Sequence, residues 1–223
     1  MNTAVWKTTD ELISAMNRVY GHMALAVLNS MIVSMIVSSS PALMQFLFTG
    51  VMQYVVIFAP LVAIFAISFN INKVSYSTAQ LMLHGFAALM GLSFATIFVV
   101  YTTASIVTAF MGAAVLFITM SGYGYFTKKD LTSVGQFMFV GLIAIVIASI
   151  INIFIGSTVM QMVISAIAVI VFLGLTAYDT QKIRQIVSVG GDTRKEEVTG
   201  ALTLYLDFIN LFIHLLQLFG NRR

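Results

Sequence analysis

Two acidic residues lie inside or at the end of apolar segments, and they have the clearest potential for chemistry in this chain. Asp207 lies seven residues into the apolar stretch that begins at Gly200, about 10 Å along a helix axis. A carboxylate that faces lipid at this depth costs about 3 kcal/mol, so Asp207 must face protein or water, or be protonated. Asp179 ends the preceding apolar stretch, in the segment Leu175-Thr-Ala-Tyr-Asp-Thr-Gln.

The spacing of the two aspartates places them at a similar depth. Positions 179 and 207 are each 14 residues from position 193, the middle of the connection between two antiparallel helices. Two carboxyl groups a few ångströms apart in a weakly polar setting cannot both ionise easily, so they share a proton and titrate as a unit. This pattern predicts a proton-sensitive pair. In the alternative, structural interpretation, Asp207 hydrogen-bonds to an adjacent helix and Asp179 pairs with Lys182 or a nearby base.

Two further polar residues follow Asp207 on the last apolar segment. Asn210 and His214 come three and seven residues later, so all three lie on roughly one face of a helix. They could continue a polar pathway, or each could form an interhelical hydrogen bond, which we favour for His214. No histidine has the spacing of a metal ligand to a second histidine, and the chain contains no cysteine.

The composition identifies the elements that must position these residues. Of the 223 residues, 60% are hydrophobic and 9% are charged, against about 25% charged residues in soluble domains, which excludes a soluble globular fold. The hydrophobic residues form seven continuous runs of about twenty residues each. Runs of this length are typical of membrane helices and not of barrel strands. We expect an all-α polytopic membrane protein with a polar segment at 1–18, a transmembrane domain at 19–219 and a tail at 220–223. The expected spans are Val19–Val37, Phe46–Phe69, Ala79–Tyr101, Ala104–Phe126, Val134–Ile155, Thr158–Tyr178 and Gly200–Phe219.

The basic residues predict the orientation in the membrane. Nine of the eleven lysines and arginines precede the first span or follow the second, fourth or sixth, so the N-terminus should be cytoplasmic. The membrane also explains the net charge of +3 better than binding to nucleic acid does. Arg222 and Arg223 would be extracytoplasmic if the last run crosses completely, which its length favours. Six acids in polar stretches are expected to be solvated: Asp10, Glu11, Asp130, Asp192, Glu196 and Glu197.

Two local patterns predict how helices begin and pack. The segment Thr8-Thr-Asp-Glu resembles a helix start, so the first helix should begin before the first apolar run. Ala87, Gly91 and Ala95 are spaced four apart, which gives a smooth stripe on which a second helix can approach closely.

Four segments carry a resemblance to a known family. Two of them are Leu175-Thr-Ala-Tyr-Asp-Thr-Gln-Lys-Ile and Tyr205-Leu-Asp-Phe-Ile-Asn-Leu-Phe, and the others begin at Gly91 and Gly122. They resemble the Bax-inhibitor-motif family of seven-helix membrane proteins from about Thr8 to Phe219. The resemblance implies that six helices surround a central seventh. It also implies a pH-sensitive calcium leak controlled by two aspartates, whose matching positions are Asp179 and Asp207.

The chain also differs from what the resemblance implies. Bacterial members of the family carry an arginine on the second helix that pairs with the aspartates in one conformation, whereas no charged residue occurs here from Gly50 to Asn72. Eukaryotic relatives have a charged C-terminal tail, whereas this chain stops at Arg223. The length and motifs are similar to those of bacterial members, which implies the inner membrane.

Three functions follow, and the first is a passive calcium leak that protons regulate. Calcium favours carboxylate oxygens and would compete with protons for Asp179 and Asp207. The second is a regulatory protein whose cytoplasmic segment Thr180–Thr199 binds a partner, since some bacterial relatives are thought to restrain a membrane-anchored AAA protease.

The third and weakest function is an intramembrane aspartyl protease. Leu-Tyr-Leu, and not a Gly-x-Gly turn, precedes Asp207. The sequence also contains no nucleotide-binding glycine loop, serine nucleophile elbow or zinc signature. We therefore expect a protein that is not an enzyme and has no cofactor, with the lipid bilayer, calcium and protons as its partners.

Overall fold

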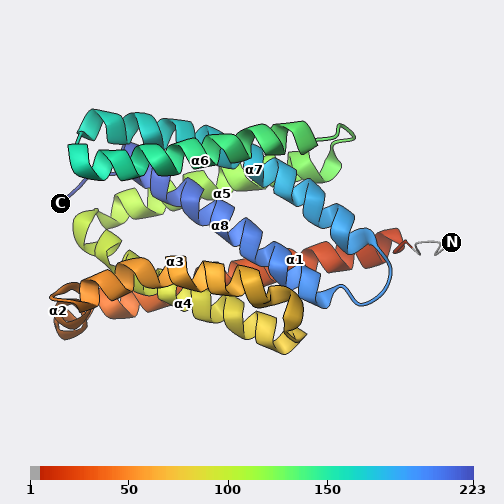
Figure 1. Ribbon diagram of the computed structural model, residues 1–223, viewed down its shortest axis with the longest axis horizontal. Helices are drawn as coiled ribbons and strands as arrows, with labels where there is room; N and C mark the ends of the chain where they lie inside the picture. Colours follow the sequence, from red (N-terminus) through yellow and green to blue (C-terminus); the bar gives the residue numbers. More distant parts are fainter. Residues whose placement is uncertain (1–5) are drawn as a thin grey trace. The chain divides into compact units, whose positions relative to one another are not determined.

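The computed structural model describes residues 6–223, and these fold into helices without a strand (Figure 1). Seven of the helices in this range are long and apolar enough to cross a membrane, which confirms the all-α polytopic fold. The elements are α1 (Thr9–Ser38), α2 (Pro41–Phe48), α3 (Met52–Asn70), the 3₁₀ turn η1 (Ile71–Lys73), α4 (Tyr76–Val100), α5 (Thr103–Phe126), α6 (Thr132–Ile155), α7 (Thr158–Ser188) and α8 (Arg194–Phe219).

The start of α1 confirms the predicted helix signal. The Thr8 hydroxyl accepts a hydrogen bond from the backbone N–H of Glu11, and the Glu11 carboxylate accepts one from the backbone N–H of Thr8 at 2.8 Å. This reciprocal arrangement satisfies two N–H groups that a helix start otherwise leaves unpaired. The helix therefore begins within the polar N-terminal segment, whose residues 1–5 lie outside the described part.

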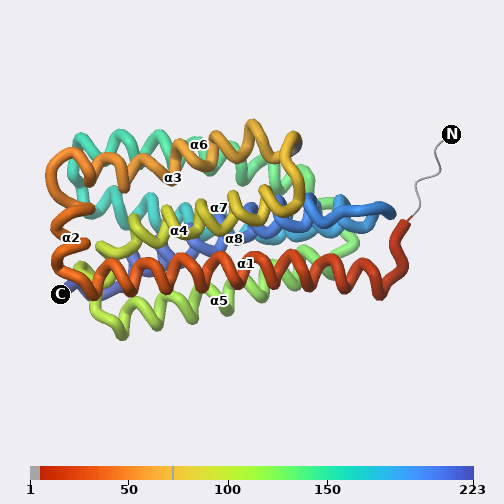
Figure 2. Tube along the Cα trace, turned by 90° about the horizontal axis from the view of Figure 1, so that it is seen from below, coloured from red at the N-terminus to blue at the C-terminus, as the bar shows by residue number. Residues whose placement is uncertain are grey.

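The predicted second span is wrong at its start. The chain forms the short α2 and then breaks at residues 49–51 before α3, as Figure 2 shows. Gly50 has a φ of +61° there, a conformation that glycine adopts readily and other residues rarely do. Hydrophobicity did not reveal this break, because the residues before it and after it are equally hydrophobic. By contrast, α7 and α8 are longer than the predicted spans, because both continue into the polar segment between them.

The residue contacts divide the chain into two compact units. Unit 1 comprises the described residues up to Thr102 together with Val189–Leu202 and Arg222–Arg223, and unit 2 comprises Thr103–Ser188 and Thr203–Asn221. The helix α8 contributes to both units. In its most apolar stretch 56% of the residues are buried, against 11% to 39% in the other spans.

In unit 1, the small residues of α4 pack against α1 as predicted. Ala87 and Ala95 are fully buried, and a Cβ atom added to Gly91 would lie 2.6 Å from the carbonyl oxygen of Ser30. The Ser30 hydroxyl donates a hydrogen bond to the carbonyl oxygen of Ala87 at 2.8 Å. The absence of larger side chains is therefore what allows the two backbones to approach.

In unit 2, two glycines place the end of α7 against its neighbours. The backbone of Gly124 on α5 lies against the Ala177 carbonyl group, and Gly135 on α6 lies against the ring of Tyr178. Figure 1 shows α6 and α7 lying side by side. Because Ala177 and Tyr178 directly precede Asp179, these contacts fix the backbone that carries the first predicted site residue.

Candidate functional site

The structure brings Asp179 and Asp207 together in unit 2. Asp207 on α8 is 4% exposed, and its Oδ2 atom has no hydrogen-bond partner in the described part of the chain. The half-buried Asp179 on α7 is close enough for the two carboxyl groups to interact electrostatically. A buried carboxylate oxygen without a partner is costly, so the pair has unused capacity to bind a proton or a cation.

The charged groups around the pair bear on its structural interpretation. Among residues 6–223, neither Asp179 nor Asp207 forms an ion pair within 4.0 Å. Lys182, the partner considered for Asp179, affects it electrostatically, but its Nζ atom lies over the ring of Tyr178, 5.6 Å from the centroid. Two carboxylates that interact in this way repel each other when both are ionised, and a shared proton would remove this repulsion.

The residues that follow Asp179 tie α7 to α5 and to the connection between α5 and α6. The hydroxyl groups of Thr180 and Ser121 are 2.9 Å apart. The Gln181 side chain accepts a hydrogen bond from the backbone N–H of Leu131 at 2.9 Å and donates one to the carbonyl oxygen of Lys129 at 2.8 Å. These bonds fix the two residues that directly follow Asp179.

We expect Gln181→Leu to lower the free energy of unfolding by about 1–3 kcal/mol, because it leaves two backbone groups without partners at a buried position. Unfolding of the purified protein in detergent measures this change. Gln185→Leu, an exposed position on the same helix, is the control and should change stability little. Equal losses in both variants would contradict a positioning role for Gln181.

The two other predicted residues, Asn210 and His214, lie on α8 beyond Asp207. The Asn210 amide donates a hydrogen bond to the Leu206 carbonyl oxygen of its own helix at 2.8 Å. The His214 Nδ1 atom lies 3.4 Å from the Ser165 hydroxyl on α7, so the interhelical bond favoured for this residue is present.

A chain of polar side chains continues from Ser165, and the sequence analysis missed it. The Gln217 Oε1 atom accepts hydrogen bonds from the Ser165 hydroxyl at 2.7 Å and from the Gln161 amide at 2.9 Å. The Asn152 amide on α6 donates in turn to Gln161 at 3.3 Å. The available signal was the helical spacing of Gln161 with Ser165 on α7 and of Gln217 with His214 on α8.

The site does not resemble a resident metal centre. The described residues contain no group of three or more acidic, histidine or cysteine side chains that could hold a metal ion. Asp179 and Asp207 could offer at most four carboxylate oxygens, whereas calcium takes about six to eight ligands. A calcium ion at this pair would therefore keep water molecules or backbone oxygens as its other ligands.

In unit 1 the expectation that Glu197 is solvated is wrong. Glu197 is 1% exposed, and both of its carboxylate oxygens accept hydrogen bonds from the Arg18 guanidinium, at 2.7 and 2.8 Å. The Thr193 hydroxyl donates a third bond at 3.1 Å, and Lys7 donates to Thr193. The pair joins α1 to the start of α8. Local sequence patterns could not reveal it, because Arg18 and Glu197 are 179 positions apart.

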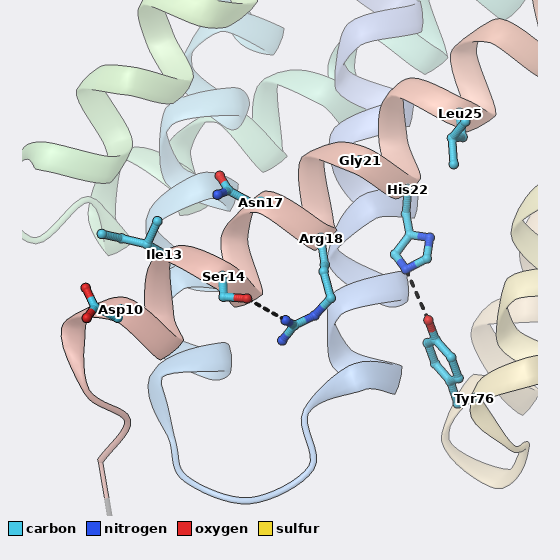
Figure 3. Close-up of a pocket in the computed structure, with 9 residues that line it drawn as sticks. All are labelled: Asp10, Ile13, Ser14, Asn17, Arg18, Gly21, His22, Leu25 and Tyr76. Carbon is cyan, nitrogen blue, oxygen red and sulfur yellow. Dashed lines mark hydrogen bonds between the residues drawn. The ribbon is translucent and has the colours of Figure 1, made fainter.

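The guanidinium of Arg18 also borders an open pocket of about 720 Å³ on unit 1 (Figure 3). Arg18 donates to the Ser14 hydroxyl at 2.8 Å, and the hydroxyl of Tyr76 lies 3.4 Å from the Nε2 atom of His22. The pocket is lined by Asp10, Ile13, Ser14, Asn17, Arg18, Gly21, His22, Leu25 and Tyr76.

The segment Thr180–Thr199, considered as a cytoplasmic segment that binds a partner, is mostly helical. Only residues 189–193 connect α7 to α8, and Thr193 within this connection is buried. At the exposed Asp192, hydrogen bonds from Arg194 hold the pKa of the carboxyl group below its ordinary value. The surface available for a partner is therefore smaller than the sequence indicated.

Comparisons with known proteins agree with this architecture. The family described as "Inhibitor of apoptosis-promoting Bax1" matches residues 13–223. The chain is 42% identical over 214 residues to "Inner membrane protein YbhL" of Escherichia coli strain K12, covering 93% of this chain and 92% of that protein. It is 38% identical over 221 residues to "Uncharacterized protein RP147" of Rickettsia prowazekii, covering 97% and 94% of the two chains.

Proposed function

Since this chain belongs to the Bax inhibitor family of membrane proteins, we propose that it is a calcium leak of the bacterial inner membrane whose opening is regulated by protons at Asp179 and Asp207. The observation that carries this proposal is the buried, unpaired Oδ2 atom of Asp207 beside a second carboxyl group. Polar groups of this kind within membrane helices are costly and typically mark ion or proton pathways.

The pair combines two properties that a regulated leak requires. Its carboxylate oxygens attract a divalent cation, and the small number of ligands would keep binding weak enough for release. A proton on the pair would remove negative charge and so compete with the cation. Protonation would thus change both the charge at the site and the contact between α7 and α8.

The proposed location and orientation rest on different evidence. The Escherichia coli relative is named an inner membrane protein, and we extend that location to this chain. The concentration of nine basic residues before the first span and in alternate loops favours a cytoplasmic N-terminus. The connection between α6 and α7 would then face the extracytoplasmic side.

Calcium flux into liposomes that contain the purified protein tests the proposal between pH about 6 and 8, where a shared proton could titrate. We expect the wild-type flux to change with pH and the flux of Asp207→Asn to be independent of pH, because an amide of similar shape cannot exchange the proton. Unfolding of both proteins checks that the variant is folded.

Asp130→Asn is the matched control for this experiment. Asp130 lies in the connection before α6, where hydrogen bonds from Thr132 hold the pKa of its carboxyl group below its ordinary value. It therefore stays ionised throughout the tested range, and its replacement should leave the pH response intact. A wild-type flux no higher than that of empty liposomes, or an unchanged pH response in Asp207→Asn, would overturn the proposal.

A further inference from the structure

We infer that the ring of Phe172, stacked on His214, forms an apolar constriction, which closes a polar passage between the aspartate pair and the connection of α6 to α7. This inference rests on the proposed leak function and adds a gating residue to it. It follows from the order of side chains along two facing helices of unit 2.

The first of these helices, α7, carries a stripe of side chains on one face. At about 100° per residue, positions 161 and 179 coincide on the helical wheel, and positions 165 and 172 lie within about 40° of them. One face of α7 thus carries, in succession, Gln161, Ser165, Ala168, Phe172, Leu175 and Asp179. Phe172 lies midway, about 10 Å along the axis from both Ser165 and Asp179.

The matching stripe on α8 contains only polar residues. Asp207, Asn210, His214 and Gln217 fall within an arc of about 80° by the same geometry. Their contacts show that this face meets the stripe on α7. His214 and Gln217 both contact Ser165, and His214 stacks on Phe172. The charge of Asp179 also acts on Asp207.

Beyond Phe172, polar groups reach the connection between α6 and α7. Ser165 is fully buried, and its hydrogen bonds lead through Gln217 and Gln161 to Asn152. The Asn152 side chain accepts a further bond from the backbone N–H of Ser157, in the connection itself, at 3.2 Å. Amide and hydroxyl groups in this order can exchange their hydrogen bonds with water or a hydrated cation.

Phe172 is the largest of three buried apolar residues that interrupt this series on α7, the others being Ala168 and Leu175. It is 5% exposed, and its ring lies nearly parallel to that of His214, with centroids 6.1 Å apart. An apolar constriction between two hydrated regions excludes water and therefore ions, without a covalent or charged barrier. The stack separates the aspartates from the polar groups near the α6–α7 connection, so its displacement would join the two regions.

Removal of this ring provides the first test. We expect Phe172→Ala to raise calcium flux by at least about tenfold, which corresponds to a barrier lower by about 1.4 kcal/mol. The matched control is Phe117→Ala. Phe117 on α5 is also 5% exposed. Its ring packs against that of Phe208 on α8, with centroids 5.8 Å apart. Its removal creates a similar cavity away from the stripe and should leave flux near the wild-type value.

Two further variants keep this test decisive. Phe172→Leu retains an apolar side chain and should raise flux less than Phe172→Ala does. If Phe172→Ala does not fold, Phe172→Thr should raise flux in its place, because it admits water with a smaller loss of volume. Equal increases in the Phe172→Ala and Phe117→Ala proteins, or unchanged flux in a folded Phe172→Ala protein with an active wild type, would overturn the inference.

Chemical labelling tests the constriction independently of calcium flux. The chain contains no cysteine, so Thr176→Cys introduces a single thiol at a fully buried position between Phe172 and Asp179. A membrane-impermeant thiol reagent, applied from the side of the α6–α7 connection, should label this variant only when Phe172→Ala is also present. Equal labelling with and without Phe172 overturns the constriction. Labelling that depends on Phe172 without wild-type calcium flux supports the constriction and refutes the calcium leak.

Discussion

Arg18→Met should lower the free energy of unfolding by about 3 kcal/mol, because it leaves the buried Glu197 carboxylate without its cation. Removal of one partner from a buried ion pair costs about 3–5 kcal/mol. We expect a loss at the lower end of this range, because the side chain of Arg18 is 44% exposed, whereas that of Glu197 is 1% exposed. Unfolding in detergent at neutral pH measures the difference.

Two comparisons show whether the loss comes from the unpaired charge. The double variant Arg18→Met with Glu197→Leu removes both charges and should recover most of the lost stability, since an apolar pair of similar volume can replace a buried ion pair. Arg194→Met breaks the exposed pair with Asp192 and should have little effect. A single Arg18 variant as stable as the wild type would show that Glu197 is not held as a buried charge.

Gly124→Ala should destabilise the protein by about 1–3 kcal/mol or more, since it adds an atom where α5 and α7 are in backbone contact. The new Cβ would lie against the carbonyl oxygen of Ala177, and 2.9 Å from its carbonyl carbon. Backbone atoms cannot rotate away as a side chain can, so α5 and α7 must separate. The Ser121–Thr180 hydrogen bond would then break, and Asp179 next to it would shift.

The control for this substitution is two residues away on the same helix. A Cβ atom added to Gly122 meets nothing within 4 Å, so Gly122→Ala should be neutral or stabilising by up to about 1 kcal/mol, because alanine favours the helix. Thermal unfolding and calcium flux of both variants measure stability and function together. We expect only Gly124→Ala to alter the pH dependence of flux, and equal behaviour of the two would refute the close contact as the means of placing Asp179.

The sequence by itself determined the class of the protein and most of its helices. Long apolar runs must form helices in a bilayer, because each backbone polar group needs a partner within its own segment. The break between α2 and α3 at Gly50 escaped this reasoning, since its neighbours are as apolar as those within the helices. Helix ends beyond the membrane, such as the start of α8 at Arg194, were also missed because hydrophobicity no longer reports on them.

The sequence likewise predicted Asp179 and Asp207 as a pair, because a carboxylate is conspicuous in an apolar segment and the two are equidistant from a turn. Only the tertiary structure decided which polar residues meet. Arg18 with Glu197, and Ser165 with Gln217, come from helices far apart in the chain, and no local period encodes such pairings. Hydrophobicity depends on each segment alone, whereas hydrogen bonds and the Phe172–His214 stack depend on how helices rotate and pack against one another.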